Sequence, residues 1–269
     1  MKIDVIYNDN CYKKIKEIPN DSIDCVYIDI PYLYTTGGTS DSPLGQRFFK
    51  RELELKQFDK QLISNSNKYL HNKIRIDKYN ALKRLDQVDL DCGIDYCIFD
   101  DLCRIMKKIN IFIWCSRLQL LDIMKYFIEE KKCMFDVLVW AKTNAIPTNR
   151  SFLTDLEYCL YFREKSVRVN PNYEYRSKWF CSSSNKKDKF KFGHPTVKPL
   201  DLVERHLKYA TNEGEIVLDC FLGSGTTAVA CKNLSKHYIG IEINKDYYKI
   251  ALDRLNNVDC NGQFSFLTF

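Results

Sequence analysis

The chain has 269 residues, of which 45% are hydrophobic and 13% aromatic, so it can bury a sizeable core and is not expected to be disordered. Lys and Arg number 41 against 35 Asp and Glu, which gives a formal net charge of +6. The sequence contains no run of about 18 apolar residues, and residues 1–8 lack the apolar core of a secretory signal. We therefore expect a cytoplasmic protein without a membrane span.

Twelve cysteines are scattered along the chain, without a CxxC pair or the paired spacing of a metal site. In a cytoplasmic protein we expect them to be reduced thiols, most of which fill small spaces in the core. No metal ligands are predicted.

Short apolar runs alternate with helix-length patterns along most of the chain. The runs that predict strands are residues 3–7, 25–29, 109–114, 135–141, 158–162, 216–219 and 238–242. The patterns that predict helices are residues 11–18, 96–108, 117–131, 200–211, 226–234 and 245–255. Because strands alternate with helices, we predict a single α/β domain over residues 1–269, with a mostly parallel sheet of about seven strands and helices on both faces.

Two stretches interrupt this alternation. Residues 33–92 begin with a loop-like sequence and continue into charged, helix-forming segments, so they predict either a helical insertion or a mobile lid. Residues 163–192, the basic-aromatic segment, contain nine Lys and Arg residues against three acidic ones, with aromatic residues interleaved. This composition suits a loop that faces phosphates, although a solvated surface loop explains the basic run alone at least as well.

A four-residue motif follows the predicted strand at 25–29 and consists of Asp29, Ile30, Pro31 and Tyr32. The carboxyl ends of strands are where open α/β sheets place their ligands. A carboxylate, main-chain carbonyls next to a proline and an aromatic ring form a small polar pocket, which suits an exocyclic amine on a ring that stacks on Tyr32. Taken alone, such a sequence is more often an ordinary turn.

A glycine-rich turn lies between the predicted strand at 216–219 and the predicted helix at 226–234. Gly223 and Gly225 let the backbone approach a ligand closely, and the N-terminus of the following helix favours negative groups. The next strand ends at Glu242, where a carboxylate is placed to accept hydrogen bonds from a ribose diol.

The pattern at residues 223–228 also fits a dinucleotide-binding loop, which is a weak signal on its own. Only 27 residues follow Glu242, too few for the second half of a dinucleotide-binding fold. We therefore expect a ligand with a single nucleoside, and an ordinary turn between strand and helix is the alternative.

Four motifs in one order resemble those of the S-adenosylmethionine-dependent DNA methyltransferases that act on amino groups, the N4/N6 type. They are residues 8–11, 29–32, 194–199 and 219–227. Residues 29–32 resemble the catalytic motif of that family, and residues 219–227 resemble its cofactor loop. The catalytic motif comes first, which is the β motif order, a permuted version of one fold.

The resemblance implies a Rossmann-like class I methyltransferase fold and S-adenosyl-L-methionine as the cofactor. It implies that Asp29, Ile30, Pro31 and Tyr32 are the catalytic residues. The implied cofactor contacts are Asp9, Cys11, Asp29, Thr196, Lys198, Asp219, Phe221, Gly223, Ser224, Gly225, Thr226 and Glu242. In the family's pattern Asp9 meets the adenine of the cofactor, whereas Thr196 and Lys198 close over its methionine end.

Asp at the first motif position and Tyr at the last resemble adenine-N6 members, whereas cytosine-N4 members more often begin with Ser. The resemblance therefore implies site-specific methylation of adenine N6 in duplex DNA, by base flipping and direct in-line transfer. Hydrogen bonds from the amine to Asp29 and to the Ile30 carbonyl are expected to aim the nitrogen lone pair at the methyl group. No Pro-Cys dipeptide is present for a covalent cytosine-C5 route. The alternatives are cytosine-N4 methylation and a non-catalytic DNA-binding module that keeps the fold.

Other residues agree with the family or depart from it. Residues 138–144 and Glu157 match it in kind, whereas Asn10 replaces its usual glycine and Ile30 is the rarer option at its position. The resemblance also implies double-stranded DNA as a partner, a homodimer, and a cognate restriction endonuclease in a restriction-modification system.

We assign target recognition to residues 33–92 and to the basic-aromatic segment, with the latter nearer the DNA. The predicted DNA contacts are Arg168, Arg176, Lys186, Lys187, Lys189 and Lys191. The lysines suit phosphates, and the two arginines suit bidentate contacts to guanine or phosphate. Residues 37–51 are the next candidates if the lysines make no contribution to binding.

Overall fold

The computed structural model describes residues 1–32, 93–144, 152–153, 155–183 and 197–257. The chain divides into two compact units, Met1–Ile30 with Asp95–Phe269, and Pro31–Ile94. Every strand and helix named below belongs to the first unit. The predicted insertion or lid at 33–92 lies outside the described residues, so the assignment of one domain with an insertion stays a prediction.

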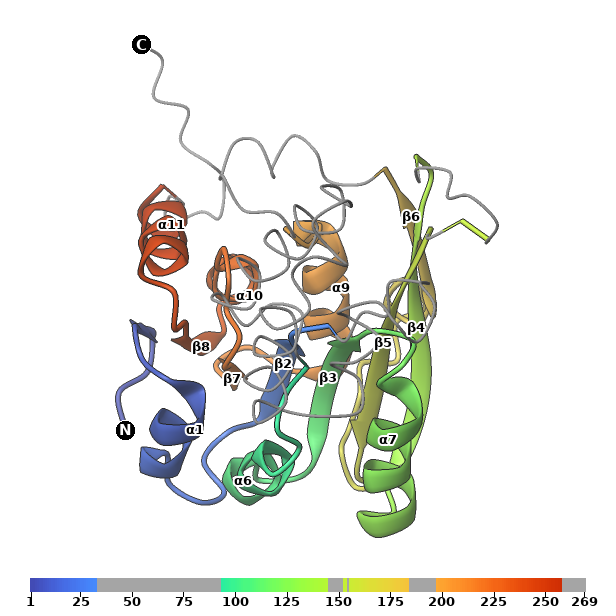
Figure 1. Cartoon of the computed structure of the whole chain (residues 1–269), viewed down its shortest axis with the longest axis horizontal. Coiled ribbons are helices and arrows are strands. Elements are labelled where there is room, and N and C mark those ends of the chain that lie inside the picture. Colours follow the sequence, from blue (N-terminus) through green and yellow to red (C-terminus); the bar gives the residue numbers. More distant parts are fainter. Residues whose placement is uncertain (33–92, 145–151, 154, 184–196, 258–269) are drawn as a thin grey trace, which may run out of the picture. The chain divides into compact units, whose positions relative to one another are not determined.

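Eight described strands form one sheet in the order β1-β8-β7-β2-β3-β5-β4-β6 (Figure 1). The strands are β1 (Val5–Tyr7), β2 (Cys25–Asp29), β3 (Asn110–Cys115), β4 (Met134–Lys142), β5 (Leu156–Arg163), β6 (Trp179–Ser182), β7 (Ile216–Asp219) and β8 (His237–Ile241). All neighbours pair in parallel except β5, which is antiparallel to both β3 and β4. The prediction of a mostly parallel α/β sheet is therefore confirmed, with one more strand than expected.

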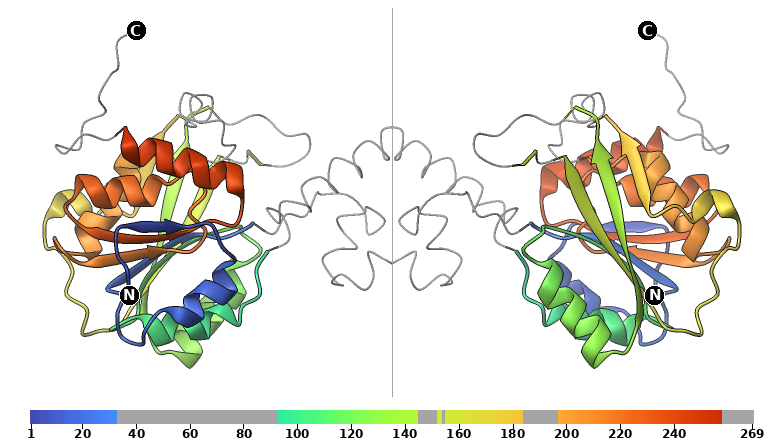
Figure 2. Two further views of the ribbon diagram at one scale, coloured as in Figure 1. Left: turned by 90° about the vertical axis from the view of Figure 1, so that its left-hand side faces the viewer. Right: turned by 90° about the vertical axis from the view of Figure 1, so that its right-hand side faces the viewer.

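Helices cover both faces of the sheet, as predicted. The helices are α1 (Cys11–Lys14) with the 3-10 turn η1 (Ile15–Glu17), α6 (Ile98–Ile105), α7 (Leu120–Met124) with the π-helical segment η2 (Lys125–Glu130), α9 (Leu200–Ala210), α10 (Thr226–Asn233) and α11 (Lys245–Asn256). Figure 2 shows α9, α10 and α11 on one face and α1, α6 and α7 on the other. This arrangement explains why the central strands β2 and β3 are nearly continuous apolar runs, since both of their faces are buried.

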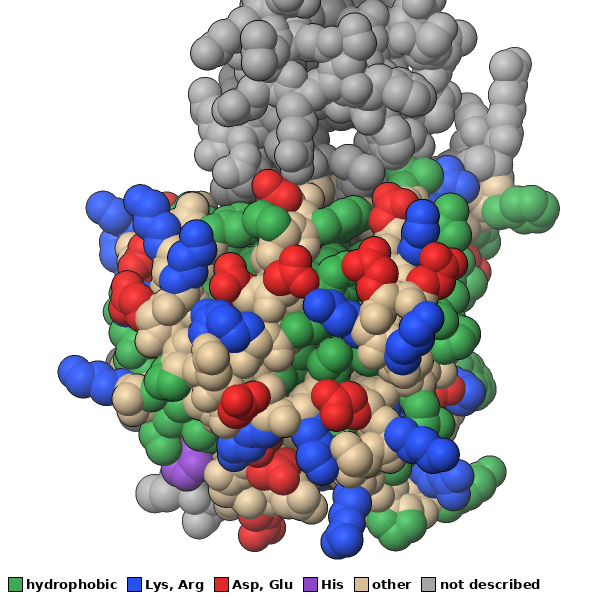
Figure 3. Space-filling view, turned by 90° about the horizontal axis from the view of Figure 1, so that it is seen from below, with side chains coloured by type: hydrophobic (Ala, Val, Ile, Leu, Met, Phe, Trp, Pro, Cys, Tyr) green, Lys and Arg blue, Asp and Glu red, His purple; other side chains and the backbone are tan. Residues whose placement is uncertain are grey.

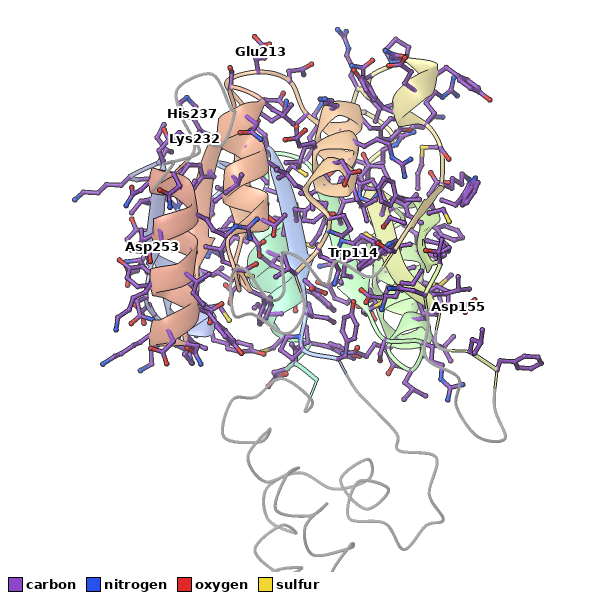
Figure 4. The ribbon with its side chains drawn as sticks, turned by 90° about the horizontal axis from the view of Figure 1, so that it is seen from above. Trp114, Asp155, Glu213, Lys232, His237 and Asp253 are labelled. Carbon is purple, nitrogen blue, oxygen red and sulfur yellow. The ribbon has the colours of Figure 1, made fainter. Side chains whose placement is uncertain are left out.

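A buried polar chain joins the two central strands to α9. The indole Nε1 of Trp114 donates to the hydroxyl of Tyr27 at 2.9 Å, and that hydroxyl lies 3.2 Å from Nδ1 of His206. Burial lowers the pKa of His206 to about 3, so the ring is neutral. In Figure 4, Trp114 lies in the interior of the described fold, whereas Asp253 lies on the side of α11. These contacts fix β2 and β3 against α9, directly beneath their carboxyl ends.

The basic-aromatic segment contains more regular structure than its composition predicts. Its first residue, Arg163, ends β5, and Trp179–Ser182 form strand β6, which pairs in parallel with β4. Arg205 of α9 donates to the carbonyl of Trp179 at 3.1 Å, and its guanidinium lies 5.1 Å from the centre of the Phe180 ring. The expectation of a loop throughout is therefore wrong for these residues, because pairing with β4 and contact with α9 order them.

Ten cysteines lie in the described ranges, and all ten are free thiols. Seven of them are buried, which agrees with the predicted packing role. Within the same ranges no helix is both long enough and apolar enough to cross a membrane.

Candidate functional site

Three acidic residues lie at the same edge of the sheet. Asp29 ends β2, Asp219 ends β7, and Glu242 directly follows β8. These three strands are neighbours and run in parallel, so their carboxyl ends meet. The strand order thus brings together two motifs that are separated by nearly two hundred residues in the sequence.

The glycine-rich loop between β7 and α10 is held by two of these carboxylates. Asp219 accepts hydrogen bonds from Phe221 N at 3.1 Å and from Thr227 Oγ1 at 2.6 Å. Glu242 accepts from Gly223 N at 2.7 Å, and its other oxygen accepts from the backbone of Asn244 at 2.7 Å. Each carboxylate oxygen has two lone pairs, so both groups retain the capacity to accept further hydrogen bonds from a ligand.

Burial changes the charge balance at this edge. Burial and, to a smaller extent, the nearby carboxylates Asp29 and Glu242 outweigh the hydrogen bonds from Thr227 and Phe221 and together raise the pKa of Asp219 to about 7. Burial also raises the pKa of Glu242. A cluster of buried acids with raised pKa values favours a ligand that carries positive charge.

Arg254, in α11, is a residue that sequence reasoning missed. Its side chain is buried, and Nη1 donates to Ser224 O at 2.8 Å, Ser224 Oγ at 2.9 Å and Thr226 Oγ1 at 3.0 Å. Ser224 and Thr226, which the resemblance assigned to the cofactor, are thus also tied to α11. The helical spacing of the sequence could have revealed it, because Arg254 shares the buried face of α11 with Ala251 and Leu255.

Asp29 is paired with a buried cation. Lys198 Nζ donates to Asp29 Oδ2 at 2.6 Å and lies 3.0 Å from Glu157 Oε2. Burial opposes the charge on Lys198, but Asp29 and Glu157 outweigh it, so the pKa of this ammonium is raised. The resemblance assigned Lys198 to the methionine end of the cofactor, and no contact with Asp29 was anticipated from the sequence.

The backbone next to Asp29 is also fixed. Ile30 is buried, and its N–H donates to the carbonyl of Trp114 at 3.2 Å. Pro31 and Tyr32 continue the chain and are half-buried, but they belong to the unit Pro31–Ile94.

The N-terminal motif follows β1. Asp9 is exposed, and its side chain accepts from Asn10 N at 2.7 Å, while Asn10 accepts from Tyr12 N at 2.9 Å and caps α1. Asparagine is among the favoured residues for this capping role, which explains its presence in place of glycine. Cys11 is buried, and burial raises the pKa of its thiol to about 12, so it acts as a packing residue.

Two of the six predicted DNA contacts lie within the described residues. Arg168 and Arg176 are exposed to solvent. Lys186, Lys187, Lys189, Lys191 and the predicted cofactor residue Thr196 lie outside the described residues.

A parallel sheet with one antiparallel strand, helices on both faces and acids at adjoining strand ends defines a class I methyltransferase fold. A crystal structure of M1.HpyAVI with SAM is similar, with a TM-score of 0.58 and 23% identity over 93% of this chain and 98% of that chain. The PvuII DNA methyltransferase, described as cytosine-N4-specific, has a TM-score of 0.60 and 13% identity over 95% of this chain and 88% of its own.

The sequence itself matches a protein family. A family profile for N6/N4 DNA methylases matches residues 23–253. The type II methyltransferase M2.LlaDCHI of Lactococcus lactis subsp. cremoris is 28% identical over 269 aligned residues, which cover 94% of this chain and 89% of the relative. The chain therefore belongs to the N6/N4 DNA methylase family, and it is a DNA methyltransferase with S-adenosylmethionine as its cofactor.

The residues at the strand ends fit this cofactor. Its sulfonium and ammonium groups are cations, and the half-buried Asp29 and the buried Asp219 and Glu242 gather at this edge of the sheet, where they favour positive charge. Its ribose hydroxyls are donors, and the carboxylates are acceptors next to a loop whose glycines Gly223 and Gly225 adopt positive φ angles of 55° and 82°.

Proposed function

We propose that this DNA methyltransferase methylates N6 of adenine within a short specific sequence of duplex DNA. The observation that carries the proposal is the position of Asp29 at the end of β2, next to β7 and its glycine-rich loop. An acceptor for an amino group and a site for the methyl donor are thus adjacent. Asp and Tyr at the two ends of the motif at residues 29–32 favour adenine over cytosine.

Several residues are proposed to hold the cofactor. Glu242 is proposed to accept hydrogen bonds from the ribose hydroxyls, and Asp219 and the turn Phe221–Gly225 are proposed to line the methionine part. Asp9 is proposed to meet the adenine, with Cys11 packing beneath it, and Thr196 and Lys198 are proposed to close the methionine end. When bound, the cofactor supplies an electrophilic methyl group on a positively charged sulfur.

The chain's own residues are proposed to orient the amine. Asp29 and the Ile30 carbonyl accept its two hydrogens, which directs the nitrogen lone pair toward the methyl group. Holding two reactants in line lowers the barrier by up to about 7–11 kcal/mol in favourable systems. The target base must leave the duplex, and stacking on Tyr32 offsets part of an unstacking cost of a few kcal/mol.

The nature of the methylated base tests this proposal. We would incubate the protein with duplex DNA and S-adenosylmethionine labelled in its methyl group, and then digest the DNA to nucleosides. Label in N6-methyladenine is the expected result. Label in N4-methylcytosine replaces the adenine assignment by the cytosine one, and label in neither base contradicts the proposal.

Cofactor binding is expected to release protons near neutral pH. With a pKa of about 7, Asp219 is partly protonated in the free protein at pH 7, and a cationic ligand nearby favours its carboxylate form. Affinity should therefore rise as the pH increases through 7, with release of about half a proton at pH 7. Calorimetry in two buffers with different ionisation enthalpies measures this release. Asp219→Asn is the control, and equal heats for the natural protein in both buffers are the opposing result.

DNA contact is proposed for the basic-aromatic segment. On the face shown in Figure 3, Lys and Arg side chains are interspersed with Asp and Glu. The described part of that face therefore lacks the uniformly positive surface that binds phosphates. Replacing the four lysines of residues 186–191 with alanine should weaken binding to all sequences alike. The slope of log affinity against log salt should fall by about 0.9 for each lost phosphate contact.

The two exposed arginines are expected to behave differently. Arg168→Ala or Arg176→Ala should relax specificity at one base pair, at a cost of about 1–3 kcal/mol, if that arginine reads a guanine. Competition binding with single-base variants of the recognition site measures this change. If the variant without the four lysines of residues 186–191 keeps the salt dependence of the natural protein, residues 37–51 become the candidate DNA contacts instead.

Similarity to a type II methyltransferase also supports a proposal about the cellular setting. The relative M2.LlaDCHI is named a type II methyltransferase, which supports a role beside a cognate restriction endonuclease. We propose a cytoplasmic location for this protein. We also propose a homodimer as its assembly, which sedimentation at several protein concentrations tests.

A further inference from the structure

A row of alternating charges leads from β4 to the end of β2. Lys142 Nζ lies 2.5 Å from Glu157 Oε1, Glu157 Oε2 lies 3.0 Å from Lys198 Nζ, and Lys198 Nζ lies 2.6 Å from Asp29 Oδ2. The four residues come from β4, β5, the segment before α9, and β2. Two cations and two carboxylates balance, so the row as a whole is neutral.

The middle of this row is enclosed by protein. The side chains of Lys198 and Glu157 are only 8% and 17% exposed, and Lys198 Nζ lies 5.0 Å from the centre of the buried Trp114 ring. Charges interact strongly in such surroundings because little water screens them. Burial opposes the charge on Glu157, but Lys198 and Lys142 outweigh it and lower its pKa to about 2, so this carboxylate stays ionised.

Lys198 therefore divides its hydrogen bonds and its charge between two carboxylates. Without the charge on Glu157, Lys198 would lose one of these two carboxylate partners and be drawn more strongly to Asp29, and the row would carry a net positive charge. A tightly held Asp29 is a weaker acceptor for another donor, since the same lone pairs and charge are engaged. A net positive charge also opposes a reaction in which positive charge moves from sulfur onto the target amine.

We infer that Glu157 is a positioning residue for methyl transfer, which acts by holding Lys198 so that Asp29 remains available to the target amine. The inference rests on the proposed function, because it takes Asp29 as the acceptor of that amine. Glu157 itself is not expected to contact substrate or cofactor.

Glu157→Gln tests the inference because it keeps the size of the side chain and removes its charge. We expect kcat to fall by roughly 10–100-fold, as for other small misplacements of reacting groups, while KM for DNA stays close to that of the natural protein. Glu157→Asp, which keeps the charge but withdraws it by one methylene, should show an intermediate kcat.

Lys142→Met is the matched control. It removes the other ion pair of Glu157 and leaves Lys198 between its two carboxylates. Glu157→Gln removes both ion pairs of Glu157, whereas Lys142→Met removes one of them. A purely structural role therefore predicts losses of cofactor affinity and turnover that follow the loss of Tm in both variants. The inference predicts that Glu157→Gln loses clearly more kcat than Lys142→Met at comparable Tm.

Two results would overturn the inference: a Glu157→Gln variant with the kcat of the natural protein, or equal losses of kcat and Tm in Glu157→Gln and Lys142→Met. If Glu157→Gln does not fold, Glu157→Asp decides, and an unchanged kcat there is contradictory. Failure of the proposed function is a separate result, since the natural protein would then produce no N6-methyladenine in the same assay.

Discussion

Asp29→Asn is expected to lower kcat for methyl transfer by roughly 10²–10³-fold or more, the range seen when one preorganised hydrogen-bonding group is removed from an active site. Asparagine preserves the volume of the side chain but removes its charge and replaces one acceptor oxygen with a donor. Because Lys198 is a donor, it retains the remaining oxygen, and the amide NH2 faces the target amine. The target amine then loses its charged acceptor. Initial rates with labelled S-adenosylmethionine and duplex DNA measure the effect.

The fold should survive this substitution. Lys198 retains its contact with Glu157, and β2 keeps its pairing with β3 and β7. Asp136→Asn serves as the control. Asp136 lies on β4, pairs with Lys178, and is not one of the acids at the strand ends. Natural turnover in Asp29→Asn would instead favour a DNA-binding module that retains the methyltransferase fold.

Gly225→Ala is expected to destabilise the protein and to abolish high-affinity cofactor binding. A Cβ atom at Gly225 would lie 2.8 Å from Ala251 Cβ and 3.0 Å from Ala251 Cα, and the residue has a φ of +82°. Overpacking typically costs about 1–3 kcal/mol, and the left-handed backbone adds about 1–2 kcal/mol for a residue with a side chain. Relief of the clash requires the loop to move away from α11, which disturbs Gly223 and its bond to Glu242.

Gly214→Ala separates the two contributions. Gly214 has a similar φ of +74°, but a Cβ there would meet nothing within 4 Å. It should show only the backbone cost and leave cofactor affinity unchanged. Urea unfolding and cofactor titration of both variants provide the comparison, and equal losses in the two would argue against close packing of the loop on α11.

Much of the sheet follows from local sequence, but β6 does not. Seven predicted strands correspond to observed ones, because buried strands such as β2 and β3 are nearly continuous apolar runs. Trp179–Ser182 is a short strand at the sheet edge, within a charged and serine-rich stretch. Its order depends on β4 and on Arg205 of α9, which no local pattern in the segment reveals.

One predicted helix also differs in detail. The sequence predicts one helix over residues 117–131, whereas the structure forms α7 from Leu120 to Met124 and leaves Leu121 75% exposed. Ile123 and Phe127 are buried instead, and the helix continues from Lys125 as a π-helical segment. A period of 3.6 residues does not anticipate the change from α- to π-helical hydrogen bonding at Lys125.

The motifs predicted the chemical nature of the site better than its internal contacts. Asp29, Asp219 and Glu242 were expected at strand ends, and the strand order places them together. The contact of Lys198 with Asp29 joins residues 169 positions apart, and Arg254 reaches Ser224 across 30 positions. Such contacts depend on the packing of whole helices against the sheet, which a motif does not encode.

Sequence-specific methylation of adenine directed by Asp29 is our proposal for this protein. Its most direct test is single-molecule sequencing of genomic DNA from cells that express either the natural protein or Asp29→Asn. We predict N6-methyladenine at nearly every copy of one short sequence with the natural protein and at none with the variant. N4-methylcytosine in place of N6-methyladenine, or the same methylated sites with both proteins, would contradict this role of Asp29.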